Sequence, residues 1–284
     1  MNPKLSLAYS TCPNDTFIFH ALVHALVPCD GLLFDVALHD VERLNQEAEA
    51  GTYDISKLSF AAIGHLRERY ALLATGAALG RGCGPLIVAK PGVLIGGGKR
   101  RQRIAVPGLR TTANLLLSLF LPGKPELVPM TFDQIMPAVS EGAVDLGVII
   151  HEGRFTYKTH GLRCLQDLGQ WWEEETGLPI PLGGIAIRRD IAKKTAHQVE
   201  RAIGASVGFA KANPQSSADY IRHHAQELSD AVTRQHIELY VNDFSRNLGR
   251  TGTRAIETLF ERAEARGIIP SSDTPIFLSR SRTL

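Results

Sequence analysis

The stretch Val144-Asp-Leu-Gly-Val-Ile-Ile-His151-Glu-Gly-Arg-Phe-Thr-Tyr157 decides the fold class of this 284-residue chain. Its apolar run, residues 146–150, is typical of a strand that is buried on both faces. The run ends abruptly at His151, which is followed by charged, glycine and aromatic residues. In open α/β sheets, ligands bind beyond the carboxyl ends of the strands. The stretch therefore indicates an α/β sheet that carries a histidine at its ligand-binding edge.

His151 is a candidate general base, because a histidine transfers protons near neutral pH without much tuning. The alternative is a loop histidine whose hydrogen bonds are satisfied locally, and the stretch taken alone favours that simpler interpretation. The pattern of strands and helices in the rest of the chain favours the interpretation of His151 as a functional residue.

Strands and helices alternate along the first part of the chain. We expect strands at residues 5–9, 33–39, 54–57, 72–75 and 85–89, and helices at residues 17–27, 41–50 and 60–70. Gly51 follows the second of these helices, as is common at a helix end. Alternation of this kind predicts a mostly parallel sheet with helices on both faces.

Two Pro/Gly-rich breaks, at residues 91–103 and 178–184, enclose a second α/β pattern. It comprises strands at 103–106, 126–129 and 145–150 and helices at 111–120 and 132–141, after which a strand at 185–188 re-enters the first sheet. Helices are expected at 192–212, 215–224, 229–240 and 251–266. The predicted domains are a larger discontinuous α/β domain, 1–92 and 186–284, and an inserted smaller one, 93–185. Two such lobes form a hinged cleft for a small ligand.

Composition excludes several classes of function. Net charge is +2, from 31 basic and 29 acidic side chains, so we expect no nucleic-acid partner. No run of about 18 apolar residues exists, so we expect no membrane span. The first residues lack the long apolar core of a signal peptide, and a cytoplasmic location is therefore expected.

Cysteines and histidines give no pattern typical of a metal site. The four cysteines are scattered, without a Cys-x-x-Cys pair, so neither zinc nor a disulfide framework is expected. His223, His224 and His236 fall on predicted helices without acidic residues at ligand-like spacing, and we interpret them as surface residues. The glycines at 96–98 lack the helix and acidic residue of a dinucleotide site, so no cofactor is expected. Cys12 could be a nucleophile, but no base lies near it in sequence, and a structural role is favoured.

Polar groups follow four predicted strands, at Ser10 to Asp15, Lys57 to Ser59, Thr111 to Ala113, and His151. Free N–H groups at helix starts favour an anion or a carbonyl oxygen. At any one junction, the hydroxyls and amides more simply cap their own helix, and Asp15 is interpreted as such a cap. Four junctions in two facing lobes favour a polar ligand. Trp171 and Trp172 are expected to pack half-buried, with lining of the cleft as the alternative.

Several longer motifs resemble the futalosine-pathway enzymes of menaquinone biosynthesis, and among them the 1,4-dihydroxy-6-naphthoate synthases. The resemblance covers nearly the whole chain. It rests on residues 10–19 (STCPNDTFIF), 57–59 (KLS), 76–85 (GAALGRGCGP), 106–108 with 111–113, 149–157 (IIHEGRFTY), 171–179 (WWEEETGLP) and 240–242 (YVN). Thr11 departs from the family, which commonly has proline there.

The resemblance implies a two-lobed fold like that of type 2 periplasmic binding proteins. It also implies cofactor-free cleavage of cyclic dehypoxanthine futalosine to 1,4-dihydroxy-6-naphthoate and dihydroxyacetone. We expect the chain to be a monomer or a weak homodimer. His151 matches the family's proposed base. Substrate contacts are implied for Lys57, Leu58, Ser59, Thr111, Thr112 and Ala113, and we add Ser10 and Asn14 from their place at the first junction. The alternatives are a solute-binding protein of the same fold and the chorismate dehydratase of the same pathway.

Overall fold

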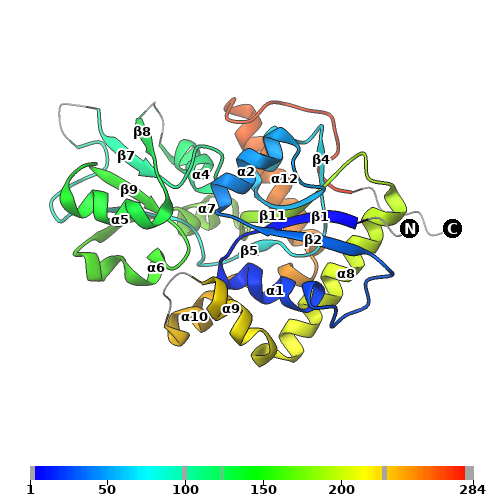
Figure 1. Cartoon of the computed structure of the whole chain (residues 1–284). Coiled ribbons are helices and arrows are strands. Elements are labelled where there is room, and N and C mark those ends of the chain that lie inside the picture. The colour runs from blue at the N-terminus through cyan, green and yellow to red at the C-terminus, as the bar shows by residue number, and fades with distance from the viewer. Residues whose placement is uncertain (1–3, 98–100, 122, 124, 226–228, 279–284) are drawn as a thin grey trace.

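The computed structural model describes residues 4–97, 101–121, 123, 125–225 and 229–278, which form two α/β lobes (Figure 1). The larger lobe is built on a six-stranded sheet of order β2-β1-β3-β11-β4, with β5 paired to β11. Its strands are β1 (Lys4–Tyr9), β2 (Leu33–Leu38), β3 (Ile55–Ser59), β4 (Tyr70–Leu72), β5 (Ala78–Gly80) and β11 (Ile180–Arg188). Its helices are α1 (Pro13–Val23), α2 (Val41–Ala50), α3 (Phe60–His65), α8 (Lys193–Ala212), α9 (Ala218–His224), α10 (Asp230–Tyr240), α11 (Asp243–Arg246) and α12 (Gly249–Ala265), with the 3₁₀ turn η2 (Pro214–Ser217) ahead of α9.

The smaller lobe is built on a five-stranded sheet of order β10-β6-β9-β7-β8. Its strands are β6 (Leu86–Ala89), β7 (Arg103–Val106), β8 (Glu126–Pro129), β9 (Leu146–Ile149) and β10 (Arg163–Asp167). Its helices are α4 (Thr112–Phe120), α5 (Phe132–Glu141), α6 (Gly153–Thr156) and α7 (Leu168–Thr176), and the 3₁₀ turn η1 (Tyr157–His160) follows α6.

Helices with clear terminal signals match their expected positions closely. Asp40 caps α2 by accepting hydrogen bonds from the N–H groups of Glu42 and Arg43, and Gly51 ends that helix with a φ of 76°. Ser229 caps α10 in the same way. A side-chain cap and a glycine in the left-handed region fix where a helix begins and ends.

Both sheets are mixed, so the expectation of a mostly parallel sheet is wrong. β1 runs parallel to β2 and β3, and β7 runs parallel to β8 and β9. However, β11 is antiparallel to β3, β4 and β5, and β6 is antiparallel to β9 and β10. The antiparallel strands are those next to the crossings between lobes, where the chain enters a sheet without the helical crossover that a parallel pair needs.

The strands also move the limits of the lobes. β6, expected in the larger domain, pairs with β9 in the smaller sheet, and β11 lies in the larger sheet from Ile180 onward. The chain therefore crosses ahead of residues 86 and 180, not at 92 and 186. The Pro/Gly-rich stretch 91–103 follows β6 within the smaller lobe, and its residues 98–100 lie outside the described residues. We propose 85–179 as the inserted lobe.

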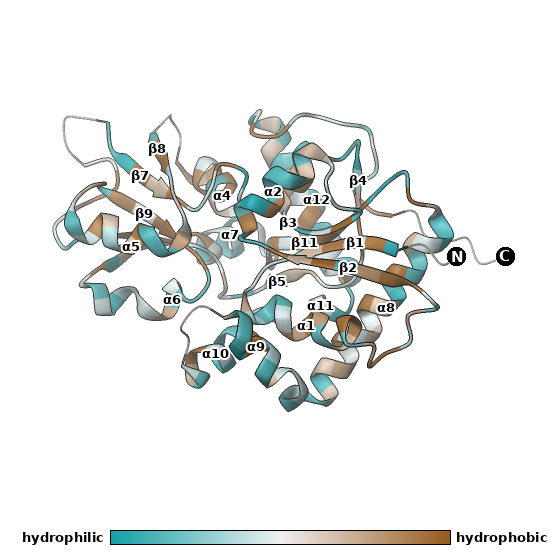
Figure 2. Ribbon diagram, in the orientation of Figure 1, coloured by the Kyte–Doolittle hydropathy of each residue, from teal (hydrophilic) through white to brown (hydrophobic). Residues whose placement is uncertain are grey.

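Apolar side chains fill both lobes, as the hydropathy colouring in Figure 2 shows for the strands. One cluster joins the lobes, because it contains Leu72 and Leu79 of the larger sheet together with Ile87 and Val106 of the smaller one. Trp172 belongs to this cluster and is fully buried, with its indole N–H donating to the Pro179 carbonyl at 3.1 Å. The half-buried packing expected for both tryptophans therefore applies only to Trp171, which packs edge-to-face on Phe120.

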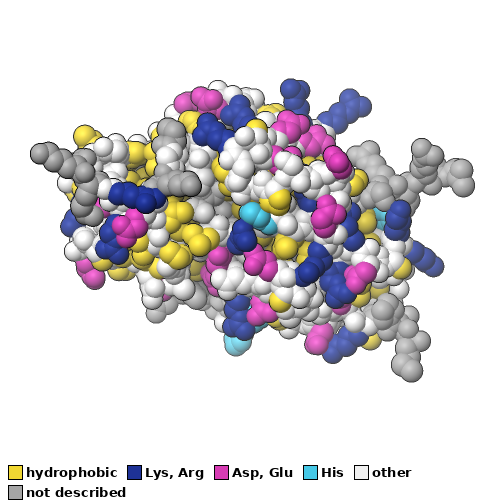
Figure 3. All heavy atoms as spheres, turned by 90° about the horizontal axis from the view of Figure 1, so that it is seen from above, with side chains coloured by type: hydrophobic (Ala, Val, Ile, Leu, Met, Phe, Trp, Pro, Cys, Tyr) yellow, Lys and Arg dark blue, Asp and Glu magenta, His cyan; other side chains and the backbone are white. Residues whose placement is uncertain are grey.

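Two further features concern the polarity of the helices and the charge of the surface. Within the described part of the chain, every helix is too short or too polar to span a bilayer. On the face seen in Figure 3, Lys and Arg side chains lie among Asp and Glu side chains, so this face carries mixed charge.

Trp172 and Trp171 provide a matched test of the core that joins the lobes. Trp172→Ala should lower the free energy of unfolding by about 3–5 kcal/mol, because it removes a fully buried ring and leaves a cavity. Trp171→Ala should cost clearly less, because its ring is only partly buried. Urea unfolding of both variants measures the difference, and equal losses would contradict the packing described for Trp172.

Candidate active site

A cavity lies between the lobes, where the carboxyl ends of β1, β3, β7 and β9 meet. The empty space there measures about 690 Å³, including the solvent at its open mouth. Every residue that the sequence singled out for the site lines it, namely Ser10, Asn14, Lys57, Leu58, Ser59, Thr111, Thr112, Ala113 and His151. The topology therefore brings the four predicted junctions together.

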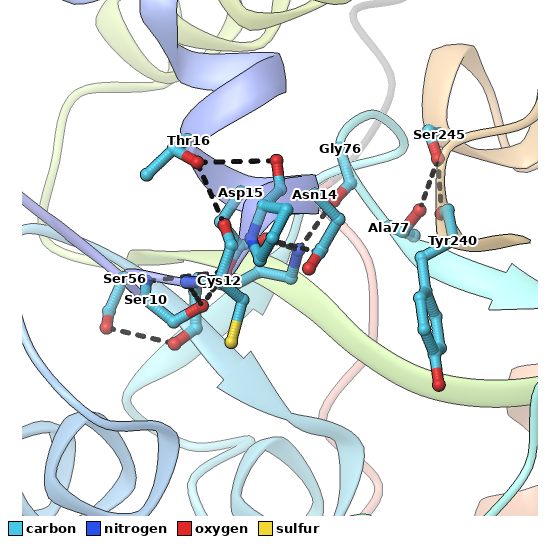
Figure 4. Close-up of polar contacts among 12 residues, drawn as sticks. Ser10, Cys12, Asn14, Asp15, Thr16, Ser56, Gly76, Ala77, Tyr240 and Ser245 are labelled. Atoms are coloured by element: carbon cyan, nitrogen blue, oxygen red, sulfur yellow. Dashed lines mark hydrogen bonds and ion pairs between the residues drawn. The ribbon is translucent and has the colours of Figure 1, made fainter. Parts of the chain in front are cut away.

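A buried ion pair forms one wall of the cavity. The Lys57 Nζ lies 2.5 Å from Asp15 Oδ1, and both side chains are more than nine-tenths buried. Asp15 also accepts hydrogen bonds from the Ser10 hydroxyl at 2.7 Å and the Asn14 amide at 2.8 Å (Figure 4). Asp15 is therefore an ion-pair partner at the start of α1, and its interpretation as a simple helix cap is wrong.

Lys57 keeps one N–H for a ligand. An ammonium group has three donors, and among the described residues its acceptors are Asp15 Oδ1 and the Gly76 carbonyl, the latter at 3.3 Å. The third N–H can bind a carboxylate or a developing oxyanion in the cavity.

The two threonine hydroxyls are already used. The Thr111 hydroxyl donates to the Gly108 carbonyl at 2.8 Å and caps α4. The Thr112 hydroxyl accepts from the Phe60 N–H at 2.8 Å and donates to the Leu182 carbonyl at 2.5 Å. Thr111 thus follows the capping interpretation, while Thr112 ties the smaller lobe to the larger one. The Thr111 N–H donates to the Gly108 carbonyl at 3.4 Å, so what the start of α4 offers a ligand is the backbone N–H groups of Thr112 and Ala113.

Ser59 differs from the threonines. Its side chain does not cap α3, and its oxygen accepts a hydrogen bond from the Asn45 amide at 3.1 Å. A hydroxyl that accepts still has its own proton to donate. Ser59 and Lys57, both on β3, therefore present donors to the cavity on the same strand.

His151 stands at the end of β9 with a φ of 54°, in the left-handed region that residues other than glycine rarely adopt. Its two ring nitrogens lie 3.6 Å and 3.7 Å from the Cys12 sulfur. Burial lowers the pKa of His151, but the charge and proximity of Cys12 outweigh this and raise the pKa to about 9. The His151 imidazole is therefore one half of a thiol–imidazole pair.

The contact partner of Cys12 could not be predicted from the sequence. Its neighbouring base is His151, which lies 139 positions away along the chain and comes from the other lobe. Only the folded topology places the two together, so the interpretation of Cys12 as merely structural lacked the observation that decides it.

His236, expected on the surface, is fully buried. Its Nε2 lies 2.9 Å from the Asn14 Oδ1, and its Nδ1 has no partner among the described residues. Burial and the nearby His151 lower its pKa well below the usual range. A neutral His236 that donates to Asn14 thus extends the polar network from Lys57 and Asp15 to α10.

The remaining walls are mostly apolar and were not predicted. Their residues are Val41, Ala78, Cys83, Pro85, Ile150, Leu182, Gly183 and Tyr240. Burial raises the pKa of the Tyr240 hydroxyl and raises that of the Cys83 thiol to about 12, so both stay neutral. Cys83, Pro85 and Tyr240 fall within motifs of the family resemblance, which was the one available signal for them. Among the described residues, no three His, Cys, Asp or Glu side chains gather as a metal site would require.

Comparison with known proteins identifies the family. A family model described as menaquinone biosynthesis matches residues 5–265. The chain belongs to the menaquinone biosynthesis family. Two curated relatives carry the name 1,4-dihydroxy-6-naphtoate synthase. The relative from Thermus thermophilus is 49% identical over 96% of this chain and 99% of its own length. The relative from Streptomyces coelicolor is 45% identical over 94% and 95%.

Solved structures confirm the two-lobed fold. A crystal structure of a protein from Archaeoglobus fulgidus is 37% identical, with a TM-score of 0.86 over 94% of this chain and 98% of that one. The ligand-binding component of an ABC-type import system from Staphylococcus aureus is 14% identical, with a TM-score of 0.72 over 99% and 97%. A Candida albicans protein described as having the generic periplasmic binding protein fold is 15% identical, with a TM-score of 0.66 over 95% and 92%. The last two show the fold alone.

The buried neutral His236 predicts a loss of stability in acid. An unfolded chain protonates this histidine below its ordinary pKa of about 6.5, whereas the folded chain does not. The unfolded state then binds more protons, so its free energy falls relative to the folded state by up to about 1.4 kcal/mol per pH unit. His236→Gln should therefore lose less stability than the wild type between neutral pH and about pH 5.

Urea unfolding of the wild type, His236→Gln and the exposed control His160→Gln at both pH values measures this difference. The control should follow the wild type. An equal pH dependence in all three chains would show that His236 is not held neutral by the fold.

Proposed function

We propose that this chain is a 1,4-dihydroxy-6-naphthoate synthase that cleaves cyclic dehypoxanthine futalosine to 1,4-dihydroxy-6-naphthoate and dihydroxyacetone. The names of two relatives that match over nearly their whole length support the reaction. The observation that carries the proposal is that His151, from the smaller lobe, and Lys57, from the larger lobe, line the same cavity. A proton acceptor and an anion-binding group then flank the same bound molecule.

The chemistry requires removal of a proton and cleavage of a carbon–carbon bond, with no change of oxidation state. His151 is placed to take the proton, which starts a retro-aldol-type cleavage or an elimination. Aromatisation of the product ring supplies the thermodynamic drive. A positioned base of this kind typically contributes about 10²–10⁴-fold in rate.

Donors on β3 and at the start of α4 are placed to hold oxygen atoms of the substrate. The free N–H of Lys57 and the free proton of Ser59 face the cavity, and α4 adds the backbone N–H groups of its first turn. Such preorganised donors stabilise a carboxylate or an oxyanion strongly where water is excluded. We propose this binding role for Lys57, Leu58 and Ser59 on one side and for Thr111, Thr112 and Ala113 on the other.

In this proposal Ser10 and Asn14 act on the substrate indirectly, through the Lys57–Asp15 pair. Their polar atoms bond to Asp15, and Asn14 also bonds to His236. We therefore propose that they hold the Lys57–Asp15 pair in place beside the substrate. The apolar walls around Leu182 and Tyr240 suit the ring system of the substrate.

Replacing His151 tests the proposal directly. His151→Asn should lower the rate of conversion of cyclic dehypoxanthine futalosine by about 10²–10⁴-fold while KM changes little, because the proton acceptor is lost and the Lys57 side of the site is kept. The exposed His160→Asn is the matched control and should keep wild-type turnover.

Chromatographic detection of 1,4-dihydroxy-6-naphthoate and dihydroxyacetone gives the rates. Normal turnover in His151→Asn would remove the role of His151. A wild-type chain that binds the substrate but forms no product would favour a solute-binding protein, and formation of a dehydration product from chorismate would favour the dehydratase. The cytoplasmic location and the monomer or weak homodimer expected from the sequence stay predictions.

A further inference from the structure

Cys12 is the residue before the first turn of α1, and its side chain makes no capping hydrogen bond. It is 8% exposed. In Figure 4 its sulfur points away from the hydrogen-bonded network around Asp15. The network therefore holds the Cys12 backbone, whose N–H donates to the Ser10 hydroxyl, but neither the network nor helix capping uses the Cys12 side chain.

The sulfur faces the His151 ring between its two nitrogens. The two distances, 3.6 Å and 3.7 Å, are nearly equal. A sulfur in line with one ring nitrogen would be much farther from the other. Either ring nitrogen is therefore within reach of the sulfur, and the nitrogen that does not pair with Cys12 is left for a bound molecule.

We propose that Cys12 and His151 act as a single proton acceptor, in which Cys12 is a positioning residue that shares a proton with the ring and orients its free nitrogen toward the substrate. The proposal rests on the proposed function, because it gives the removed proton its destination. It adds Cys12 to the proposed base, and it changes the protonation state of that base before substrate binds.

The proton count balances. Before reaction the pair holds two exchangeable protons, either as thiol and neutral imidazole or as thiolate and imidazolium. Imidazolium has a proton on both nitrogens, so the ring takes the substrate proton from the thiol–imidazole form, in which its own N–H points to the sulfur and its other nitrogen carries no proton. Abstraction of the substrate proton then gives thiol and imidazolium, and the electron pair of the broken bond stays on the substrate. The extra proton then passes to the leaving fragment or to solvent, which restores the starting state.

Neighbouring charges favour the ion-pair form. From their own segments, Glu152 and Asp40 raise the pKa of His151 in addition to Cys12. The start of α1, an eleven-residue helix, favours negative charge on a cysteine at this position. The other facing groups on α10, His236 and Tyr240, are neutral, and the charge of Asp15 is paired with Lys57.

Cys83 provides an internal control, because it lines the cavity without this pairing. Burial raises the pKa of its thiol to about 12. Cys12 and Cys83 are both buried, and they should differ in reactivity because Cys12 contacts a histidine of the cavity and Cys83 does not.

Alkylation by iodoacetamide, followed by peptide mapping of each cysteine, tests the pair without any need for turnover. At a pH of about 6.5, Cys12 should react about tenfold or more faster in the wild type than in His151→Asn, because thiolate is the reacting form. Cys83 should stay unmodified in both. Equal rates at Cys12 in the two chains would overturn the proposal, and His151→Gln provides a second variant should the first fail to fold.

The titration of the His151 ring is the second readout. In ring-resolved NMR spectra, with the His151 signals assigned by their loss in His151→Asn, Cys12→Ala should move the midpoint down by about one pH unit or more, because burial is then opposed only by the weaker effects of Glu152 and Asp40. The acid limb of kcat/KM should move in the same direction. A Cys12→Ala or Cys12→Ser chain that changes only in stability, with the midpoint in place, would leave Cys12 a purely structural residue and contradict the pair.

Failure of this inference and failure of the proposed function are distinguishable. Reactivity and titration as expected, without formation of naphthoate, would keep the pair and overturn the reaction. Formation of naphthoate with neither effect present would keep the reaction and overturn the pair.

Discussion

The ion pair between Lys57 and Asp15 is the constraint on which the site depends. Two opposite charges removed from water are tolerated only where geometry is good and the remaining donors and acceptors are satisfied. Here the pair is 2.5 Å apart, and Ser10, Asn14 and the Gly76 carbonyl complete it. The pair thereby fixes the start of α1 against β3, and with it the position of Cys12 on one side and of Asn14 and His236 on the other.

Contacts between the smaller and the larger lobe complete the site. Thr112 bonds to Phe60 and Leu182 across the boundary, and Glu42 of α2 accepts a hydrogen bond from the Arg110 N–H. These contacts hold the smaller lobe so that His151, in its left-handed backbone conformation, meets Cys12. Strained backbone of this kind persists only where the surroundings determine it. The position of the proposed base, His151, thus depends on contacts from both lobes.

The sequence predicts elements best where local chemistry determines them. The bounds expected for β8 and α5 match the structure, and α2 begins and ends at its Asp40 cap and Gly51. β5 and β10 and the helices α6 and α7 were not predicted, because they are short or lack a clear apolar period. The membership of β6 in the smaller sheet was missed for another reason, since strand pairing is decided by tertiary contacts that leave no local pattern.

The site residues divide in the same way, into those placed by local sequence pattern and those placed by tertiary contacts. Residues at strand ends were predicted correctly to line one cavity, because the ends of neighbouring strands converge by topology. The Cys12–His151 contact and the burial of His236 depend on residues 139 and 222 positions apart, and no local spacing encodes such distances. Thr111 shows that the position of a residue can be predicted while the use of its side chain is not. It lines the cavity as expected, but its hydroxyl caps its own helix and bonds to the Gly108 carbonyl.

A crystal structure of the His151→Asn chain with cyclic dehypoxanthine futalosine tests the central claim most directly. The account predicts that the molecule lies between the lobes, with one of its oxygen atoms within hydrogen-bond distance of the Lys57 Nζ and its reacting carbon against residue 151. Electron density for the substrate outside this cavity, or inside it but away from both Lys57 and residue 151, would contradict the account.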